Sequence, residues 1–363
     1  MTTSTDLVGV RCVLMRGGTS KGPLFLASDI PTDARARDRM LLAALGSPHS
    51  RQVDGIGGGH PLSSKVAIVG PASVADADVD YLFAQVSVDT ASVDTAPSCG
   101  NMLAAVGPFA IEAGLVRPRD GETVVRVHSV NTGVVADAVV RTPGGIVTYA
   151  GEHSVAGVPG SAAPVRITVR DAAGSVTGRL LPTGQTREEV GGVAVTLIDY
   201  AMPLMVVAAS SVGLTGAETP HAIHERTSVL RQIERMRLEA GERMGLGDVR
   251  DSVVPKVSIV SPPSNGGSIT SRYLNPRSCH PAHAVLGAMC LAIAARTEGT
   301  LAADVVDPAQ GAGRLRIEHP CGNLDIEVAT AAGGEGLTAS VVRTARKLFE
   351  GRVFVPAELF RVP

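Results

Sequence analysis

A cysteine that opens an alanine-rich segment, Cys99, stands before two residues suited to anion binding, Gly100 and Asn101. A thiol in the first turn of a helix feels the positive end of the helix dipole, which favours the reactive thiolate. The helix N–H groups bind carboxylates, Gly100 lets the backbone approach a ligand closely, and Asn101 adds a side-chain donor. The segment therefore predicts proton transfer on an anion, although cysteine at such a position is also common as buried filler.

A second serine-cysteine pair, Ser278-Cys279, also precedes an alanine-rich segment and is followed by His280. If both helix ends faced one ligand, a proton could be taken at one end and returned at the other. The other three cysteines lie in apolar or strand-like contexts and are interpreted as structural: Cys12, Cys290 and Cys321.

A glycine-rich turn follows the strand expected at residues 10–15. It combines two cations and two hydroxyls in the order Arg16, Gly17, Gly18, Thr19, Ser20, Lys21 and Gly22. The order Ser-Lys-Gly differs from that of the nucleotide phosphate loop, and the glycine run at 55–59 opens no clear helix for a dinucleotide. The turn therefore predicts an anion site that does not bind nucleotides.

Metal and cofactor binding are not predicted. Histidines near Cys279 and Glu225 have ligand-like spacings, but no four-ligand set is formed. The pair His221 and His224 also lacks the glutamate that directly follows the first histidine in zinc-protease helices.

Composition indicates a globular protein that acts on small molecules. The 363 residues are 44% hydrophobic and 19% charged, with a net charge of −2 and scattered basic residues, which argues against nucleic-acid and membrane partners. The first residues do not resemble a secretory leader, no apolar run reaches ~18 residues, and five irregularly spaced cysteines do not suggest disulfides. We therefore expect a cytoplasmic protein with free thiols.

The chain repeats itself at about half its length. Cys99 and Cys279 are 180 residues apart (279 − 99 = 180), and at this offset Gly107 matches Gly287. Residues 23–24 match 203–204 at the same offset, and residues 65–69 match 256–260 at a slightly different one.

The elements that must position these residues are short strands around a helix in each half. Residues 79–88 read as a strand, 99–114 as a helix, and 222–243 as a further helix of the second half. With a junction at the polar residues 181–188, the length predicts two mixed α+β domains, 1–188 and 189–363, with the last strands returning to the first domain.

Several motifs occur in order along the chain. They are residues 15–22 (Met-Arg-Gly-Gly-Thr-Ser-Lys-Gly), 54–58 (Asp-Gly-Ile-Gly-Gly), 64–69 (Ser-Lys-Val-Ala-Ile-Val), 80–86, 98–101 (Ser-Cys-Gly-Asn) and 342–346. Together they resemble the 2-methylaconitate isomerase family of the diaminopimelate epimerase-like superfamily, nearest to its 4-oxalomesaconate tautomerases. The resemblance implies two pseudo-symmetric domains, each a barrel-like sheet around a central helix, with the active site in the cleft between them. It also implies a homodimer or larger oligomer.

The family pattern implies residue roles. Lys65 and Cys99 match its proton-transfer residues, and Cys279 occupies the place of the second cysteine of the epimerases. The pattern also implies substrate contacts, to which the helix-start residues derived above are added. The predicted contacts are Arg16, Gly18, Thr19, Ser20, Lys21, Ser64, Gly100, Asn101, Arg272 and His280.

The implied reaction is a cofactor-free keto-enol tautomerisation of 4-oxalomesaconate, a tricarboxylate of gallate- and protocatechuate-type degradation. Lys65 or Cys99 would remove the activated methylene proton, while Arg16, Arg272 and the helix N-termini hold the carboxylates. Three alternatives stay open: an allylic cis-trans isomerase of 2-methylaconitate or a related aconitate, a two-cysteine amino-acid epimerase, and a non-catalytic carboxylate-binding protein.

Overall fold

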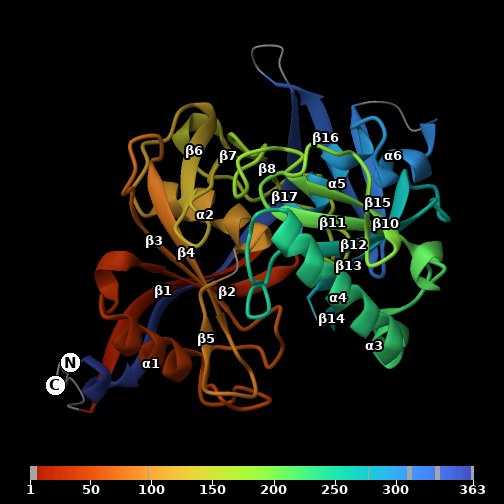
Figure 1. Ribbon diagram of the computed structural model, residues 1–363. Helices are drawn as coiled ribbons and strands as arrows, with labels where there is room; N and C mark the ends of the chain where they lie inside the picture. Colours follow the sequence, from red (N-terminus) through yellow and green to blue (C-terminus); the bar gives the residue numbers. More distant parts are fainter. Residues whose placement is uncertain (1–5, 97, 277, 309–312, 332–335, 361–363) are drawn as a thin grey trace. The chain divides into compact units, whose positions relative to one another are not determined.

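The computed structural model describes residues 6–96, 98–276, 278–308, 313–331 and 336–360 (Figure 1). The chain packs as two units, Met1–Ile167 with Arg343–Pro363, and Thr168–Val342. The boundary lies ahead of residues 181–188, where the sequence places the domain junction. Two strands contain boundary residues: β8 (Pro164–Val169) and β17 (Leu337–Pro356). Among the described residues, no helix is long and apolar enough to cross a membrane.

The first unit is a strongly bent sheet. Its strands are β1 (Leu7–Gly17), β2 (Ser20–Leu26), β3 (Lys65–Pro71), β4 (Val79–Val86), β5 (Val93–Asp94), β6 (Gly121–Ser129), β7 (Val135–Thr142) and the end of β17. The hairpins β1–β2, β3–β4 and β6–β7 are antiparallel, and the steps β2–β3 and β4–β6 are parallel. β5 pairs with β4, and β17 pairs antiparallel with β1.

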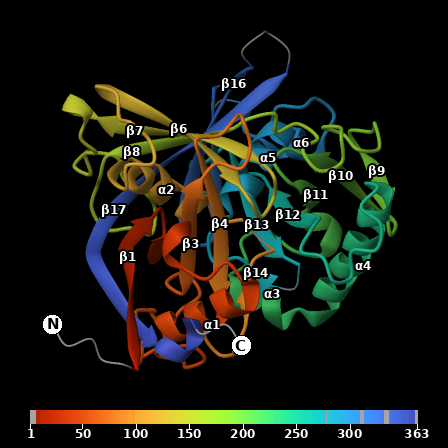
Figure 2. The ribbon, with the colours of Figure 1, turned by 90° about the vertical axis from the view of Figure 1, so that its left-hand side faces the viewer.

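Helix α2 (Gly100–Glu112) is the centre of the first unit, and its residues 100–111 are all buried. It contacts β1, β2, β3, β4, β6 and β7 (Figure 2). Gly107 allows the close approach, because an added Cβ there would lie 2.8 Å from Val140 Cγ2. The sheet wraps around α2, but it is not a clean barrel.

The other face of this sheet packs on α1 (Ala34–Leu45), which Asp33 caps by accepting a hydrogen bond from Ala36 N. The apolar cluster between them includes Val10, Phe25, Val66 and Met40. Short 3-10 helices lie at η1 (Ala27–Asp29), η2 (Pro143–Gly145) and η5 (Ala357–Phe360).

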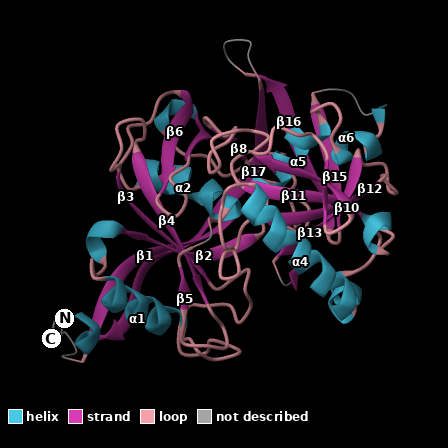
Figure 3. Cartoon of the chain, in the orientation of Figure 1, coloured by secondary structure: helices cyan, strands magenta, loops and turns pink. Residues whose placement is uncertain are grey.

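The second unit repeats this order of strands around a central helix, and Figure 3 colours its strands and helices by type. Its strands are β9 (Glu188–Val190), β10 (Val193–Asp199), β11 (Pro203–Ala208), β12 (Lys256–Ser261), β13 (Ile269–Asn275), β14 (Ser278–Cys279), β15 (Arg314–His319), β16 (Gly322–Thr330) and the start of β17. Antiparallel hairpins β10–β11, β12–β13 and β15–β16 alternate with the parallel steps β11–β12 and β13–β15, as in the first unit.

The central helix of the second unit is α5 (Val285–Ala295), which contacts β10, β11, β12 and β16. Gly287 repeats the role of Gly107, since an added Cβ would lie 2.2 Å from Tyr273 Cε2. The other elements are α3 (Pro220–Glu225), α4 (Thr227–Arg243), α6 (Leu301–Val305) and η3 (Ala209–Val212). The expectation of two similar α+β halves is confirmed at the level of strand order.

Two predicted helices differ from the structure. The helix expected over 222–243 is two helices, because Arg226 leaves the helical region with φ −84° and ψ 64°. Cys279 does not open a helix: it lies in β14, and α5 begins six residues later. The reason is Pro281, which favours extended backbone at His280, and His280 N donates to Tyr273 O as a strand residue does.

Candidate active site

Cys99 is the N-cap residue of α2, in extended conformation and partly buried, so the predicted placement at a helix start is confirmed. Its carbonyl oxygen accepts a hydrogen bond of 3.1 Å from the hydroxyl of Tyr81 on β4. Burial raises the pKa of Tyr81 well above its ordinary value, and the nearby Cys99 raises it further, so this phenol stays a donor. The start of α2 is thereby fixed to the sheet.

The glycine-rich turn between β1 and β2 packs directly on the first turn of α2. An added Cβ would lie 2.3 Å from Asn101 O at Gly17 and 2.1 Å from Asn101 Oδ1 at Gly18, where φ is +50°. Asn101 Nδ2 donates to Thr19 Oγ1 at 3.2 Å, and Gly18 N donates to Thr344 O at 2.8 Å. The turn, the helix start and β17 therefore form one assembly within the first unit.

Two buried polar atoms in this assembly have no hydrogen-bond partner among the described residues, Ser20 Oγ and Asn101 Oδ1. A buried group without a partner costs roughly 1–3 kcal/mol, so such groups are commonly satisfied by a ligand or water. The hydroxyl of Ser20 can donate to a carboxylate oxygen, as predicted for a substrate contact.

Lys65 is the first residue of β3, and its Nζ donates to Gln85 Oε1 of β4 at 2.5 Å. The same Nζ lies 5.0 Å from the centre of the Phe83 ring. Gln85 is itself fixed, because its Nε2 donates to Ser64 O at 2.8 Å. An added Cβ on Gly22 would lie 1.7 Å from Lys65 O, so β2 and β3 are in contact here.

Strand β4 brings Lys65 and Cys99 to one face. Tyr81, Phe83 and Gln85 are every second residue of β4, so their side chains lie on one face. Tyr81 contacts Cys99, and Phe83 and Gln85 contact Lys65. Alternate residues of a strand are spaced by roughly 7 Å, so neighbouring positions on this face hold the two predicted proton-transfer residues.

Ser64 is fully buried, and its hydroxyl is already engaged. It donates to Val86 O at 2.8 Å and accepts from Gln52 Nε2 at 2.7 Å. Its observed role is to hold the segment before Lys65, and its role as a substrate contact stays a prediction.

Arg16 and Lys21 lie on the other face of the sheet. Side chains alternate along a strand, and Gly17, next to Arg16, faces Asn101. Arg16 Nη1 donates to Gly18 O at 2.9 Å and to the carbonyl and hydroxyl oxygens of Thr344, both at 3.0 Å, so it holds the turn against β17.

The second unit contains the remaining three predicted site residues. Arg272 is buried, and its Nε donates to Glu218 O at 2.6 Å. Burial raises the pKa of Cys279 to about 11, although the charge of Arg272 opposes the rise. A thiol with this pKa is mostly protonated near neutral pH, which suits a proton donor better than a base. His280 Nδ1 accepts from Ala282 N at 3.0 Å.

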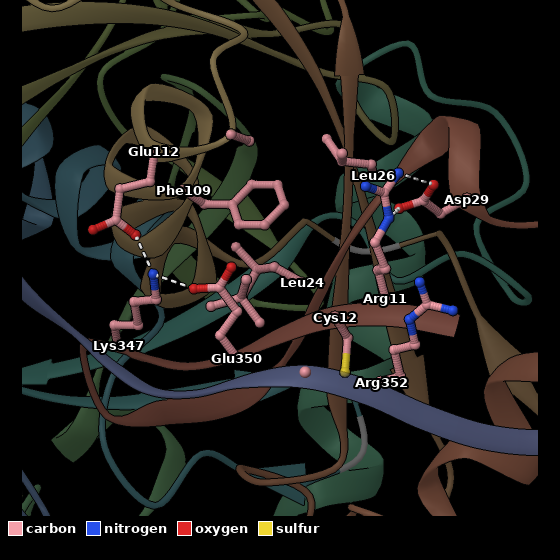
Figure 4. Close-up of a pocket in the computed structure, with 13 residues that line it drawn as sticks. Arg11, Cys12, Leu24, Leu26, Asp29, Phe109, Glu112, Lys347, Glu350 and Arg352 are labelled. Atoms are coloured by element: carbon pink, nitrogen blue, oxygen red, sulfur yellow. Dashed lines mark hydrogen bonds and ion pairs between the residues drawn. The ribbon is translucent and has the colours of Figure 1, made fainter. Parts of the chain in front are cut away.

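Two cavities of the first unit differ in their charges. One, of about 520 Å³, has Arg16, Lys21 and Arg346 in its wall. The other, of about 400 Å³, is apolar at Leu24 and Phe109, and all of its charged side chains except Arg352 are drawn in ion pairs (Figure 4). The pairs drawn in that view are Arg11 with Asp29, and Lys347 with Glu112 and Glu350. No group of three or more metal-ligating side chains occurs in the part of the chain that the structure describes.

Sequence reasoning did not single out Tyr81, Phe83, Gln85 or Arg346. The first three carry a recognisable signal, because a glutamine follows two aromatic residues at alternate positions of the strand. Arg346 belongs to the motif 342–346, but its place beside Arg16 follows only from the pairing of β17 with β1.

Comparisons with known proteins agree with this architecture. The family model described as PrpF protein matches residues 7–356. The (4E)-oxalomesaconate Delta-isomerase of Novosphingobium sp. (strain KA1) is 49% identical over 345 residues, covering 95% of this chain and 97% of the relative. The 4-oxalomesaconate tautomerase of Pseudomonas putida is 46% identical over 358 residues, covering 98% of each.

A solved structure is similar along its whole length. The crystal structure of methylitaconate-delta-isomerase has a TM-score of 0.84 and 34% sequence identity, covering 99% of this chain and 98% of that one. It confirms the expected diaminopimelate epimerase-like fold class. Since the family model and relatives named as isomerases span nearly the whole sequence, the chain belongs to the PrpF protein family and is an isomerase.

Proposed function

We propose that the protein acts on 4-oxalomesaconate by moving a proton without a cofactor, with Lys65 and Cys99 as the proton-transfer residues. The observation that carries the proposal is the shared face of β4, whose Phe83 and Gln85 hold Lys65 and whose Tyr81 holds Cys99. Two relatives at 46% and 49% identity are named for this substrate, which supports the choice.

The chemistry begins with the methylene between the ketone and the unsaturated carboxylate. Removing one proton gives a dienolate whose charge spreads over both groups, and returning a proton to oxygen gives the enol. One of the pair Lys65 and Cys99 takes the proton, while the first N–H groups of α2 and the hydroxyl of Ser20 hold carboxylate oxygens.

Returning the proton to the distal carbon instead would shift the double bond, and no enol would form. One relative is named a tautomerase of 4-oxalomesaconate and another its Delta-isomerase, and a third is named 2-methyl-aconitate isomerase. A second candidate is therefore double-bond migration on the same substrate or on 2-methylaconitate. Both routes share the first proton removal, and the position of the group that returns the proton decides between them.

In the second unit, Arg272 and His280 stay proposed carboxylate contacts. Cys279 stays a proposed catalytic residue, as a proton donor, because burial raises the pKa of its thiol. All five cysteines are free, which supports a reducing, cytoplasmic location for the protein. A homo-oligomer and a place in gallate-type degradation remain part of the proposal.

The test mixes chelator-treated protein with fresh 4-oxalomesaconate and follows the conjugated enol by ultraviolet absorbance and the double-bond position by proton NMR. The same assay is run on 2-methylaconitate. Enol formation supports the tautomerase, a shifted double bond supports the second candidate, and turnover of only the aconitate overturns the substrate assignment. Binding without proton exchange would show a carboxylate-binding protein.

A further inference from the structure

Three cations lie side by side across three strands of the first unit. The register pairs Arg16 of β1 with Lys21 of β2 on one side and with Arg346 of β17 on the other. Neighbouring strands are about 4.8 Å apart, so the three Cα atoms span roughly 10 Å on one face of the sheet. We refer to Lys21, Arg16 and Arg346 as the cation row.

The cation row lies on the face opposite Lys65. Val66 and Phe25 belong to the apolar cluster that packs on α1, and side chains alternate along each strand. Lys65 is therefore on the α2 side, whereas Lys21, four residues before Phe25, and its partner Arg16 are on the α1 side. This separates the cation row from the proposed proton-transfer residues.

No acidic side chain compensates these charges in the part of the chain described. Lys21 and Arg346 form no ion pair there, and Arg16 donates only to neutral oxygens of Gly18 and Thr344. Like charges directly opposite on neighbouring strands are destabilising. Burial lowers the pKa of Arg16, and the charge of Arg346 lowers it further, as the close approach of two cations requires.

The cavity beside the cation row has room for a small molecule. Its volume is about 520 Å³, and residues 149–150, 157–159 and 161–162 line it together with Thr19 and Ser20 of the turn. No aspartate or glutamate is among its described lining residues, whereas the cavity of Figure 4 pairs Lys347 and Arg11 with carboxylates of its own.

We infer that this cavity, which adjoins the proposed substrate contact Ser20 but has its cations on the sheet face opposite Lys65, is a second anion-binding site and takes an anion with two or three carboxylates. Separate cations spread over roughly 10 Å suit an extended polycarboxylate better than a compact anion. Arginine binds carboxylates through paired donors, and Arg346 and the unused nitrogens of Arg16 supply them. The bound anion also contacts the turn at Thr19, which Asn101 holds at the start of α2.

The experiment titrates the full-length protein with tricarballylate, a saturated tricarboxylate, by calorimetry. We expect Arg346→Ala to weaken binding roughly ten- to a hundredfold, since hydrogen bonds to charged groups contribute about 1.5–3 kcal/mol each. Arg346→Lys should keep part of the affinity for tricarballylate that Arg346→Ala loses. The matched control is Arg352→Ala, an exposed arginine six residues further along β17 that lines the other cavity, and it should bind as the wild type does.

Four results would overturn the inference. The first is that the wild type does not bind tricarballylate, and the second is that Arg346→Ala and Arg352→Ala lose affinity for it equally. The third is that inorganic phosphate binds as tightly as tricarballylate. The fourth is that Arg346→Ala raises the KM for 4-oxalomesaconate by the same factor by which it weakens tricarballylate binding. The last result would place the cation row in the substrate site and leave the proposed function standing. Failure of the enol assay alone would leave this binding result untouched.

Discussion

Lys65 and Cys99 are held by different means on the same strand face. The amine is oriented by a side-chain amide and an aromatic ring, whereas the cysteine is held through its backbone carbonyl, which leaves the thiol free to react. Replacing either functional group should therefore remove chemistry without unfolding the sheet.

We expect Lys65→Ala and Cys99→Ser each to lower kcat by about 10²–10⁴-fold, the usual contribution of general acid–base catalysis. The measurement is the initial rate of enol formation, with circular dichroism as a check of folding. Lys347→Ala and Cys321→Ser are matched controls, because Lys347 pairs with Glu112 and Glu350, and Cys321 is exposed in the second unit. Near-normal rates in both Lys65→Ala and Cys99→Ser would rule out this mechanism.

Gly18 offers a second prediction at the residue scale. Gly18→Ala places a Cβ 2.1 Å from Asn101 Oδ1 at a positive φ, so the turn must move away from α2. We expect kcat/KM to fall by at least tenfold, because a displacement of about 1 Å in a site can cost about a hundredfold. The control is Gly133→Ala, where φ is +71° but no atom lies within 4 Å of the added Cβ. Equal activity of the two variants would contradict a positioning role for the turn.

At the scale of elements, Glu318 of β15 organises the segment between β12 and β13. Its carboxylate accepts hydrogen bonds from the backbone of Ser264, Asn265 and Gly267 and from the hydroxyls of Ser264 and Thr270. Burial alone would raise the pKa of Glu318, but these donors outweigh burial and lower it to about 2.

A carboxyl whose pKa is lower in the folded state contributes stability above its unfolded pKa of about 4.3. That contribution is lost as the pH falls towards 2. We expect Glu318→Gln to lower the free energy of unfolding of the second unit by roughly 2–3 kcal/mol at pH 7. The same variant should make this free energy depend less on pH between about pH 5 and 2. Urea titrations at several pH values measure this, with exposed Glu327→Gln as control. An unchanged acid dependence in Glu318→Gln would contradict the assignment.

The elements also show what sequence can predict. The start of α2 at Cys99 was predictable, because local signals agree: an alanine-rich apolar segment follows a small residue and glycine. The match of Ser278-Cys279 to Ser98-Cys99 was misleading about helix structure, because Pro281 extends the backbone and delays α5. Arg16 and Lys21 were identified as an anion site, but the sheet face on which they lie depends on register, which a sequence does not reveal.

At the scale of the whole molecule, each unit has its own central helix and its own apolar core. We therefore expect more than one unfolding transition, since chains with several cores often depart from two-state behaviour. Hydrogen exchange followed by mass spectrometry in increasing urea should show α2 and α5 losing protection at different concentrations. Glu318→Gln should shift the α5 transition alone. Simultaneous exchange of both helices in every variant would contradict this.

The two units also differ in how the chain completes them. The second unit is one continuous segment, whereas β1 of the first unit pairs with the end of β17, near the other terminus. At about 5–20 residues per second, a ribosome needs roughly 10–40 s to pass from Ile167 to Pro356. During synthesis, the second unit can thus fold first, while the edge of β1 stays open to other strands. Premature termination before Ala345 would remove every β17 partner of β1, leave that edge permanently unpaired and expose the chain to aggregation and proteolysis.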